Sequence, residues 1–225
     1  MDYSEKYKLA CDLIKQGYLI HCTDNEFDNF DSEYIIGGSR AREGYGFYFS
    51  DMPYKPIEYG KYFYIIKKED FNFIDADFNI NKSNYLYNNL VIPYDKEIYK
   101  LEELLFNCRN NREYDEINNE IISLKEKQRN DQLSIEIDNA IKKHNLSTIG
   151  QIEQYIPTNY IKDFANRLKE IGYDGFVYDG IYTVFNFDKL NKKVRRYNIE
   201  NSQKQLNEKK LRKLINTILS EMLKK

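Results

Sequence analysis

The sequence has few of the residues on which metal and disulfide chemistry depends. It contains two histidines, His21 and His144, which are too few for His-rich metal chemistry. The three cysteines, Cys11, Cys22 and Cys108, lie far apart, so no two of them have the spacing of metal ligands. An odd number of scattered cysteines fits a reducing compartment. We therefore expect no bound metal and a reducing environment.

Excess charge and long apolar segments are missing as well. The chain carries 34 Lys and Arg against 36 Asp and Glu, a net charge of −2, which argues against a generic polyanion binder but leaves a local basic patch open. The longest strongly apolar run, Tyr62 to Ile66, is far shorter than the roughly 20 residues that cross a membrane. The sequence begins with neither the basic nor the apolar region of a signal peptide. These absences predict a cytoplasmic protein without a membrane span.

The remaining composition is that of a folded domain of moderate size. Apolar residues make up 41% of the 225 residues, enough for a packed core in one domain, with or without an insertion. Short apolar stretches predict five strands: 18–23, the end of 44–49, 62–67, 175–178 and 182–185. Three helices are predicted around them: 5–15 with Ser4 as N-cap, a short helix from Asp51 or Pro53 to Gly60, and 158–170 with Thr158 as N-cap and Gly172 as its stop. This irregular order favours an α+β fold over a doubly wound sheet.

Residues 81–157 have a different character and read as a helical insertion. Apolar periodicity predicts helices over 97–106, 114–127 and about 133–143. The asparagine-rich stretch 107–112 is typical of a turn, so the first two helices should form a hairpin. Two interpretations stay open: a subdomain that packs on itself, or an arm that docks a target.

The spacing of apolar and basic residues in 200–225 predicts a basic amphipathic helix. Seven Lys and Arg stand against two Glu from Lys204 to Lys225, beside an apolar stripe of Leu211, Leu214, Ile215, Ile218, Leu219 and Met222. Such a segment packs on the body, binds a partner or contacts an anionic surface. The basic run 192–196 before it fits either a phosphate contact or a solvated edge strand.

Four stretches hold residues that can carry chemistry. They are His21-Cys22-Thr23 on a strand, Gly44 to Asp51 with Tyr59 eleven residues after Tyr48, Tyr173-Asp174-Gly175, and the strand 181–186. A histidine beside a hydroxyl can bind a ribose diol, glycines let a ligand approach the backbone, and two tyrosines can enclose a flat ring. The ordinary alternatives are a core histidine, core tyrosines in a chain with 21 of them, and turn glycines.

In this order the stretches resemble the ADP-ribosyltransferases of the diphtheria-toxin/poly(ADP-ribose) polymerase branch. Residues 46–59, Gly-Phe-Tyr-Phe-Ser-Asp-Met-x-x-Lys-x-x-x-Tyr, resemble the branch's "G-[IL]-Y-F-A-D-M-x-x-K-x-x-x-Y" stretch. Residues 19–23 are similar to its "L-x-H-G-[ST]" strand, and 182–186 to its last catalytic strand. The stretches 21–30 and Gly172-Tyr173-Asp174-Gly175 are closest to the ADP-ribosyltransferase domains of phage polyvalent proteins. The resemblance covers roughly residues 18–80 and 158–199.

The resemblance implies a split two-sheet fold that takes NAD⁺ as its substrate. Residues 1–80 and 158–199 would form this core, with the helical insertion 81–157 and the C-terminal helix 200–225 outside it. NAD⁺ would bind as a bent dinucleotide between two small sheets. The implied roles are a ribose contact for His21 supported by Thr23, a backbone bond to the carboxamide at Cys22, close backbone approach at Gly46, and packing of the nicotinamide by Tyr48 and Tyr59.

Three residues depart from the pattern of that branch. Cys22 replaces a glycine, which brings a side chain toward the carboxamide, and Pro56 replaces a serine that bonds it. Ile181 stands where chain-forming polymerases have a catalytic glutamate, so the resemblance implies transfer of single ADP-ribose units. Asp179 would supply the missing carboxylate if the strand extended back to it, since side chains two apart on a strand share a face. The alternative is that Asp179 belongs to an Asp-Gly turn.

The leading hypothesis is a mono-ADP-ribosyltransferase that modifies a macromolecule, with a host protein in a phage–host conflict as its target and the host cytoplasm as its place of action. NAD⁺ hydrolysis or ADP-ribosylation of a nucleic acid is the second. A catalytically inactive module that binds a partner through the insertion is the third.

Overall fold

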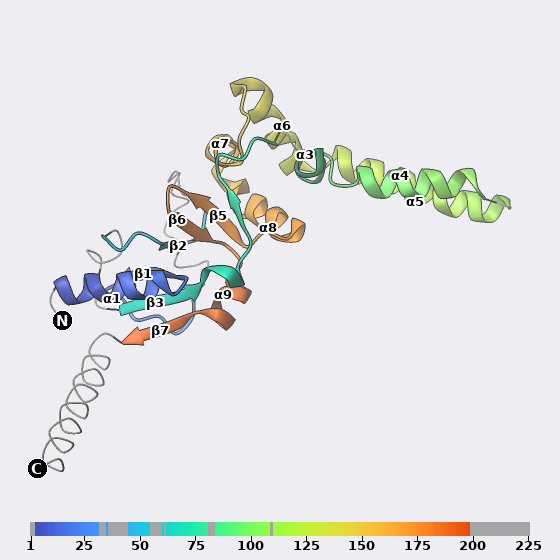
Figure 1. The fold of residues 1–225 in the computed structure, drawn as a ribbon. Coiled ribbons are helices and arrows are strands. Elements are labelled where there is room, and N and C mark those ends of the chain that lie inside the picture. Colours follow the sequence, from blue (N-terminus) through green and yellow to red (C-terminus); the bar gives the residue numbers. More distant parts are fainter. Residues whose placement is uncertain are drawn as a thin grey trace, which may run out of the picture.

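The chain folds into a mixed α+β structure around one seven-stranded sheet (Figure 1). The computed structural model describes residues 3–31, 35, 45–54, 60, 62–80, 84–108 and 110–198. The predicted helix around Tyr59, with Pro56, falls almost wholly outside these ranges, as do Gly44 and the C-terminal segment 200–225. The predicted α+β class is confirmed, whereas the resemblance implied two small sheets and the structure pairs all described strands into one.

The strand order places segments from both ends of the chain side by side. It runs β4 (Phe73–Asp75), β5 (Gly175–Tyr178), β6 (Ile181–Val184), β2 (Phe47–Ser50), β1 (Tyr18–Thr23), β3 (Tyr62–Lys67) and β7 (Arg195–Asn198). Neighbours are antiparallel except β4 and β5. The basic run therefore ends in an edge strand, as predicted, while β4 was not predicted because three residues carry too little pattern.

The ladder is weakest between β1 and β2. These strands share a single residue pair, Ile20 with Ser50, whereas β1 and β3 share six pairs and β2 and β6 share four. The sheet therefore opens beyond Ile20, with β3 and β7 on one side and β4 to β6 on the other.

Helices cover one face of the sheet in two separate places. Helix α1 (Tyr3–Lys15) packs Ala10 and Leu13 against Ile20 and Phe63. Over β4 and β5, α8 (Ile161–Ile171) and α7 (Ile149–Tyr155) belong to the largest cluster, in which the Phe164 and Phe176 rings stack at 6.5 Å. The opposite face is covered by α9 (Phe187–Lys193) and by the chain after β1.

Helix ends show which local predictions were right. Gly172 ends α8 with a φ of 107°, and Asn145 ends α6 (Gln132–His144) with a φ of 52°, both left-handed caps. Ser4 is not an N-cap, because α1 already includes it. Thr158 is not one either: it opens a short 3₁₀ turn, Thr158–Tyr160, and α8 follows without a side-chain cap.

The insertion has two parts with different packing. Helices α3 (Asn84–Val91), α6 and α7 share the core of α8 and β5. Helices α4 (Asp95–Phe106) and α5 (Asn111–Arg129) pair with each other through a small cluster that includes Ile98, Ile121 and Leu124. This α4–α5 arm projects away from the sheet (Figure 1), so the predicted hairpin exists and is joined to the body only at its base.

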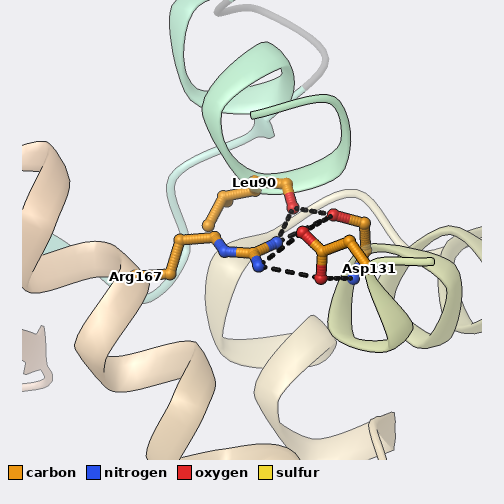
Figure 2. A network of polar contacts seen from close by, with 4 residues as sticks. Leu90, Asp131 and Arg167 are labelled. Atoms are coloured by element: carbon orange, nitrogen blue, oxygen red, sulfur yellow. Dashed lines mark hydrogen bonds and ion pairs between the residues drawn. The ribbon is translucent and has the colours of Figure 1, made fainter. Parts of the chain in front are cut away.

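A buried ion pair fixes the base of the arm. The Arg167 guanidinium on α8 donates to both carboxylate oxygens of Asp131, at 2.9 and 2.7 Å, and to the Leu90 carbonyl at 2.9 Å (Figure 2). Asp131 is also the N-cap of α6, directly after α5. Although burial alone would raise it, the pKa of Asp131 is lowered by the hydrogen bonds and charge of Arg167. One arginine thus holds α3, α6 and α8 together.

We expect Asp131→Asn to destabilise the protein by about 2 kcal/mol, because the change removes the charged partner of Arg167, whose side chain is only 16% exposed. The asparagine can still cap α6, so cap loss does not confuse the result. Urea unfolding measures the effect, with Lys142→Met as control, since its exposed pair with Asp138 contributes about 0.5 kcal/mol or less. Equal stability of Asp131→Asn and the control would contradict the role given to Arg167.

Candidate functional site

The His21 imidazole spans the opening between β1 and β2. Its Nδ1 lies 2.7 Å from the Tyr48 carbonyl oxygen, which only accepts, so Nδ1 carries the proton and donates it. Burial lowers the pKa of His21, while this hydrogen bond opposes the shift. The ring is therefore neutral at pH 7 and its Nε2 is an acceptor. A side chain replaces the backbone ladder at this point of the sheet.

Aromatic rings surround His21 on one face of the sheet. Five ring centroids lie 5.6 to 6.4 Å from that of His21: those of Phe49, Phe30, Tyr64, Phe27 and Phe47. Nε2 has no hydrogen-bond partner among the described residues, and no fully buried side-chain polar atom in those residues lacks one. Nε2 therefore reaches solvent at the margin of the aromatic cluster.

The predicted residues divide between the two faces of the sheet. Side chains alternate along a strand, and Phe47 and Phe49 flank Tyr48, so the Tyr48 ring leaves the face opposite to His21. Thr23 shares the His21 face, and its Oγ1 accepts from the Asn25 amide at 3.1 Å. His21 and Tyr48 meet through a backbone carbonyl and not through their side chains.

On the Tyr48 face, β2 and β6 form a strip between the two helix-covered regions. Pairing of Ser50 with Ile181, and of Tyr48 with Thr183, brings these four side chains to one surface. Tyr48 and Ile181 are half-buried, and neither belongs to any apolar cluster formed by the described residues. We define Tyr48, Ser50, Ile181 and Thr183 as the β2–β6 strip. Ile181 and Tyr48 thus lie on one surface of the sheet.

Cys22 lies beside the β2–β6 strip but beneath α1. Its side chain packs in the cluster of Ala10 and Phe63, and Sγ donates to the Gly60 carbonyl at 3.3 Å. Burial raises the pKa of the Cys22 thiol to about 12. The thiol is therefore protonated and packs beneath α1, and its expected approach to the carboxamide stays a prediction.

Two glycines, Gly46 of the predicted site and Gly60 beyond it, are required by backbone packing. Gly46 has a φ of 146°, and a Cβ there would lie 2.4 Å from the Val184 carbonyl oxygen. A Cβ on Gly60 would lie 1.9 Å from the Thr23 carbonyl carbon. These positions need glycine because β6 and the end of β1 pass directly against them, whether or not a ligand binds.

Asp179 belongs to the β5–β6 turn. Asp179 and Gly180 have φ values of 46° and 70°, the pair of positive angles that defines a type I′ hairpin turn. The strand β6 begins at Ile181, and the Asp179 side chain is exposed. The predicted turn is confirmed, and the strand extension on which a catalytic role for Asp179 depended is absent.

The third predicted stretch proves to be a structural hub. The buried Asp174 carboxylate accepts from the Asn72 amide at 2.8 Å, the Asn186 side chain at 2.6 Å and Lys189 Nζ at 2.5 Å. These bonds join the starts of β4, β5 and α9. None of these three bonds involves a residue of the β2–β6 strip.

Sequence reasoning missed a polar cluster at the end of β2. The Tyr182 hydroxyl donates to Asp51 Oδ2 at 2.8 Å and accepts from Lys68 Nζ, which also lies 3.4 Å from Asp51 Oδ2. Burial raises the pKa of Tyr182. Asp51 belongs to the recognised stretch, but nothing in the sequence connects it with Lys68. The cluster ties β2 and β6 to the end of β3.

A buried carboxylate at the other end of β2 was also missed. Glu153 on α7 accepts from the Tyr45 amide, with a distance of 2.6 Å to Oε1. Its side chain is 5% exposed, and burial raises the pKa of Glu153 to about 7. No sequence signal marks Glu153, because its surroundings come from segments 108 residues apart.

Comparison with known proteins adds no relative. No family model, curated protein or solved structure matches the chain. Across the ranges that the structure describes, no group of three or more His, Cys, Asp or Glu could hold a metal ion. Within the same ranges, no helix has the length and apolar character needed to cross a membrane.

We expect Glu153→Gln to stabilise the protein at alkaline pH, because burial of the carboxylate makes its ionisation costly. The pKa is about 7 in the folded chain and 4.5 when unfolded. The contribution of Glu153 to the free energy of unfolding is therefore fully present below pH 4.5. It falls by about 3 kcal/mol as the pH rises to 7. Glutamine still accepts from Tyr45 but does not ionise.

The measurement is the free energy of unfolding of wild type and variant from pH 4.5 to 8. The difference should grow across this range, since titration of His21 affects both proteins alike and cancels. The exposed Glu120→Gln is the matched control and should follow wild type. A constant difference between wild type and Glu153→Gln would show that Glu153 does not titrate in this way.

Proposed function

We propose that the chain binds NAD⁺ and transfers single ADP-ribose units to a macromolecular target, with a host protein in a phage–host conflict as that target. The observation that carries the proposal is the opening between β1 and β2. Beside it, the β2–β6 strip presents Tyr48 and Ile181 between two packed regions. The order of the recognised stretches along the chain supports the same assignment.

The proposal gives a role to each residue that the resemblance singled out. The Tyr48 ring, with Tyr59, packs on the nicotinamide, and the backbone at Cys22 bonds the carboxamide. His21 lies on the opposite face, so its Nε2 would accept from a ribose hydroxyl only where the dinucleotide enters the opening between β1 and β2; Nδ1 is committed to the Tyr48 carbonyl. This division gives His21 two tasks: it positions β2 through one nitrogen and binds the sugar through the other.

The proposed reaction replaces one glycosidic bond with another. The bond between ribose C1′ and the nicotinamide nitrogen breaks, and neutral nicotinamide leaves with the bonding electrons. An acceptor nucleophile attacks C1′ of the oxocarbenium-like centre and loses its proton. Positioning dominates catalysis here, since the leaving group of NAD⁺ is already activated by its positive charge. Ile181 offers no carboxylate to activate a ribose hydroxyl, which favours single transfers over chains.

A partner-binding module without catalysis is the second candidate. The isoleucine at position 181 supports it, because the β2–β6 strip then lacks an acid. The α4–α5 arm also supports it, since the Phe106 side chain at its end is 92% exposed. In this case the sheet is a scaffold and the arm makes the functional contact.

The test is incubation of the full chain with biotin-labelled NAD⁺ and a bacterial lysate. We expect a discrete labelled band together with nicotinamide release, and a loss of both by at least about tenfold in Tyr48→Ala. The matched control is Tyr155→Ala, a tyrosine that is 51% exposed on α7. Unlabelled NAD⁺ should raise the melting temperature of wild type and control by mass action.

The other outcomes separate the alternatives. A label that nuclease removes would mean a nucleic-acid acceptor, and nicotinamide release without label would mean hydrolysis. If wild type shows no nicotinamide release and no thermal shift, the enzyme hypothesis is rejected and the binding module remains. Equal activity of Tyr48→Ala and wild type would exclude the β2–β6 strip as the site.

A further inference from the structure

One face of α4 alternates acidic and aromatic side chains. Asp95, Tyr99 and Phe106 are linked by spacings of three or four through either Glu102 or Glu103, so the five residues follow one side of the helix over three turns. Tyr99 is 62% exposed and Phe106 is 92% exposed. Ile98, on a different side of α4, packs against α5. We call these five residues the α4 strip; its exposed aromatic rings have no role in holding the arm together.

The α4 strip continues into a groove at the base of the arm. The groove has a volume of about 620 Å³ and is lined by Asp95 and Tyr99 of α4, by Ile135 and Asp138 of α6, and by Lys125 and Arg129 of α5. Lys125 pairs with Glu102 at 2.8 Å, which leaves Asp95 and Glu103 as the acids of the α4 strip that this lysine does not neutralise. An occupant should therefore be apolar along one side and basic beside it.

The chain itself contains a segment of this chemistry. Residues 209–222 carry Leu211, Leu214, Ile215 and Ile218 at helical spacing, flanked by Lys209, Lys210, Arg212 and Lys213. From Leu211 to Met222 a helix would extend about 16 Å, the same length as the α4 strip from Asp95 to Phe106. Apolar residues can cover Tyr99 and Phe106 while the basic residues face the acids.

The topology makes a second copy the better source of this segment. β7, which precedes it, and β4, which leads into the insertion, form opposite edges of the sheet. Six strand spacings separate them by about 29 Å, and the arm projects further away beyond β4 (Figure 1). The ten residues 199–208 reach at most about 36 Å when fully extended. After the sheet width of about 29 Å, at most about 7 Å of this reach would remain for the further distance to the arm of the same copy, which makes a second copy the better source.

We propose that residues 209–222 of one copy bind the α4 strip of a second copy. A two-fold axis would repeat the contact, so that each copy gives its C-terminal segment and receives the other's. This inference does not rest on the proposed function, because it uses neither the β2–β6 strip nor NAD⁺.

The test measures the mass of the full chain by sedimentation velocity, across protein concentrations. Wild type should form a dimer, and Phe106→Ser should raise its dissociation constant at least about tenfold. Leu214→Asp/Ile218→Asp should do the same from the other side of the contact. Tyr85→Ser is the matched control, an aromatic that is 55% exposed on α3 and should leave the dimer unchanged. Because Phe106 is almost fully exposed, its loss should not unfold the protein.

Mixing the two defective proteins gives the decisive result. Phe106→Ser keeps an intact C-terminal segment and Leu214→Asp/Ile218→Asp keeps an intact α4 strip, so an equimolar mixture should form a heterodimer through one contact. The proposal is overturned if wild type is a monomer at every concentration, which is also the result expected if the segment binds its own arm. A dimer that survives both variants, or a mixture that stays monomeric, overturns it equally.

Discussion

The separation of β1 from β2 is the constraint on which the arrangement of the sheet depends. A sheet that opens between its central strands leaves backbone groups that must find other partners. Here the His21 imidazole takes the Tyr48 carbonyl, and aromatic rings exclude water from one side of that bond. The opposite face is left to Tyr48 and Ile181, between α1 and α8. Position and exposure of the candidate site thus follow from a gap in the hydrogen-bond ladder.

Much of the polar chemistry near this gap serves the fold. Asp174 joins three elements, Tyr182 and Asp51 fasten the end of β2, and Gly46 admits the Val184 carbonyl. Such roles are typical of residues that recur in a motif, because a site needs a rigid support as well as reacting groups. A motif match by itself therefore does not separate the residues that bind a ligand from the residues that support the fold.

Polar contacts also support the fold where the insertion joins the body. Arg167 and Asp131 anchor its base through a bidentate pair, whereas α4 and α5 beyond that point pack mainly on each other. An arm that is rigid at its base and exposes aromatic rings toward its end is suited to contact another molecule. The packed base explains how 81–157 can be part of the core and still extend from it. The sequence could suggest either interpretation; the structure shows which helices pack on the body and which pack on each other, and docking of a target by the arm stays a proposal.

The sequence alone determined the elements whose pattern is local. The strands 18–23 and 62–67 were predicted to the residue, as were the Asp179-Gly180 turn and the Gly172 stop, because periodicity and left-handed turns are written in neighbouring residues. Only the tertiary structure decided that His21 and Tyr48 use opposite faces, that Cys22 lies beneath α1, and that β4 exists at all. Those facts depend on segments that meet across 27 residues for His21 and Tyr48, 38 for Cys22 and Gly60, and 102 for β4 and β5, and partners at such distances leave no local signal.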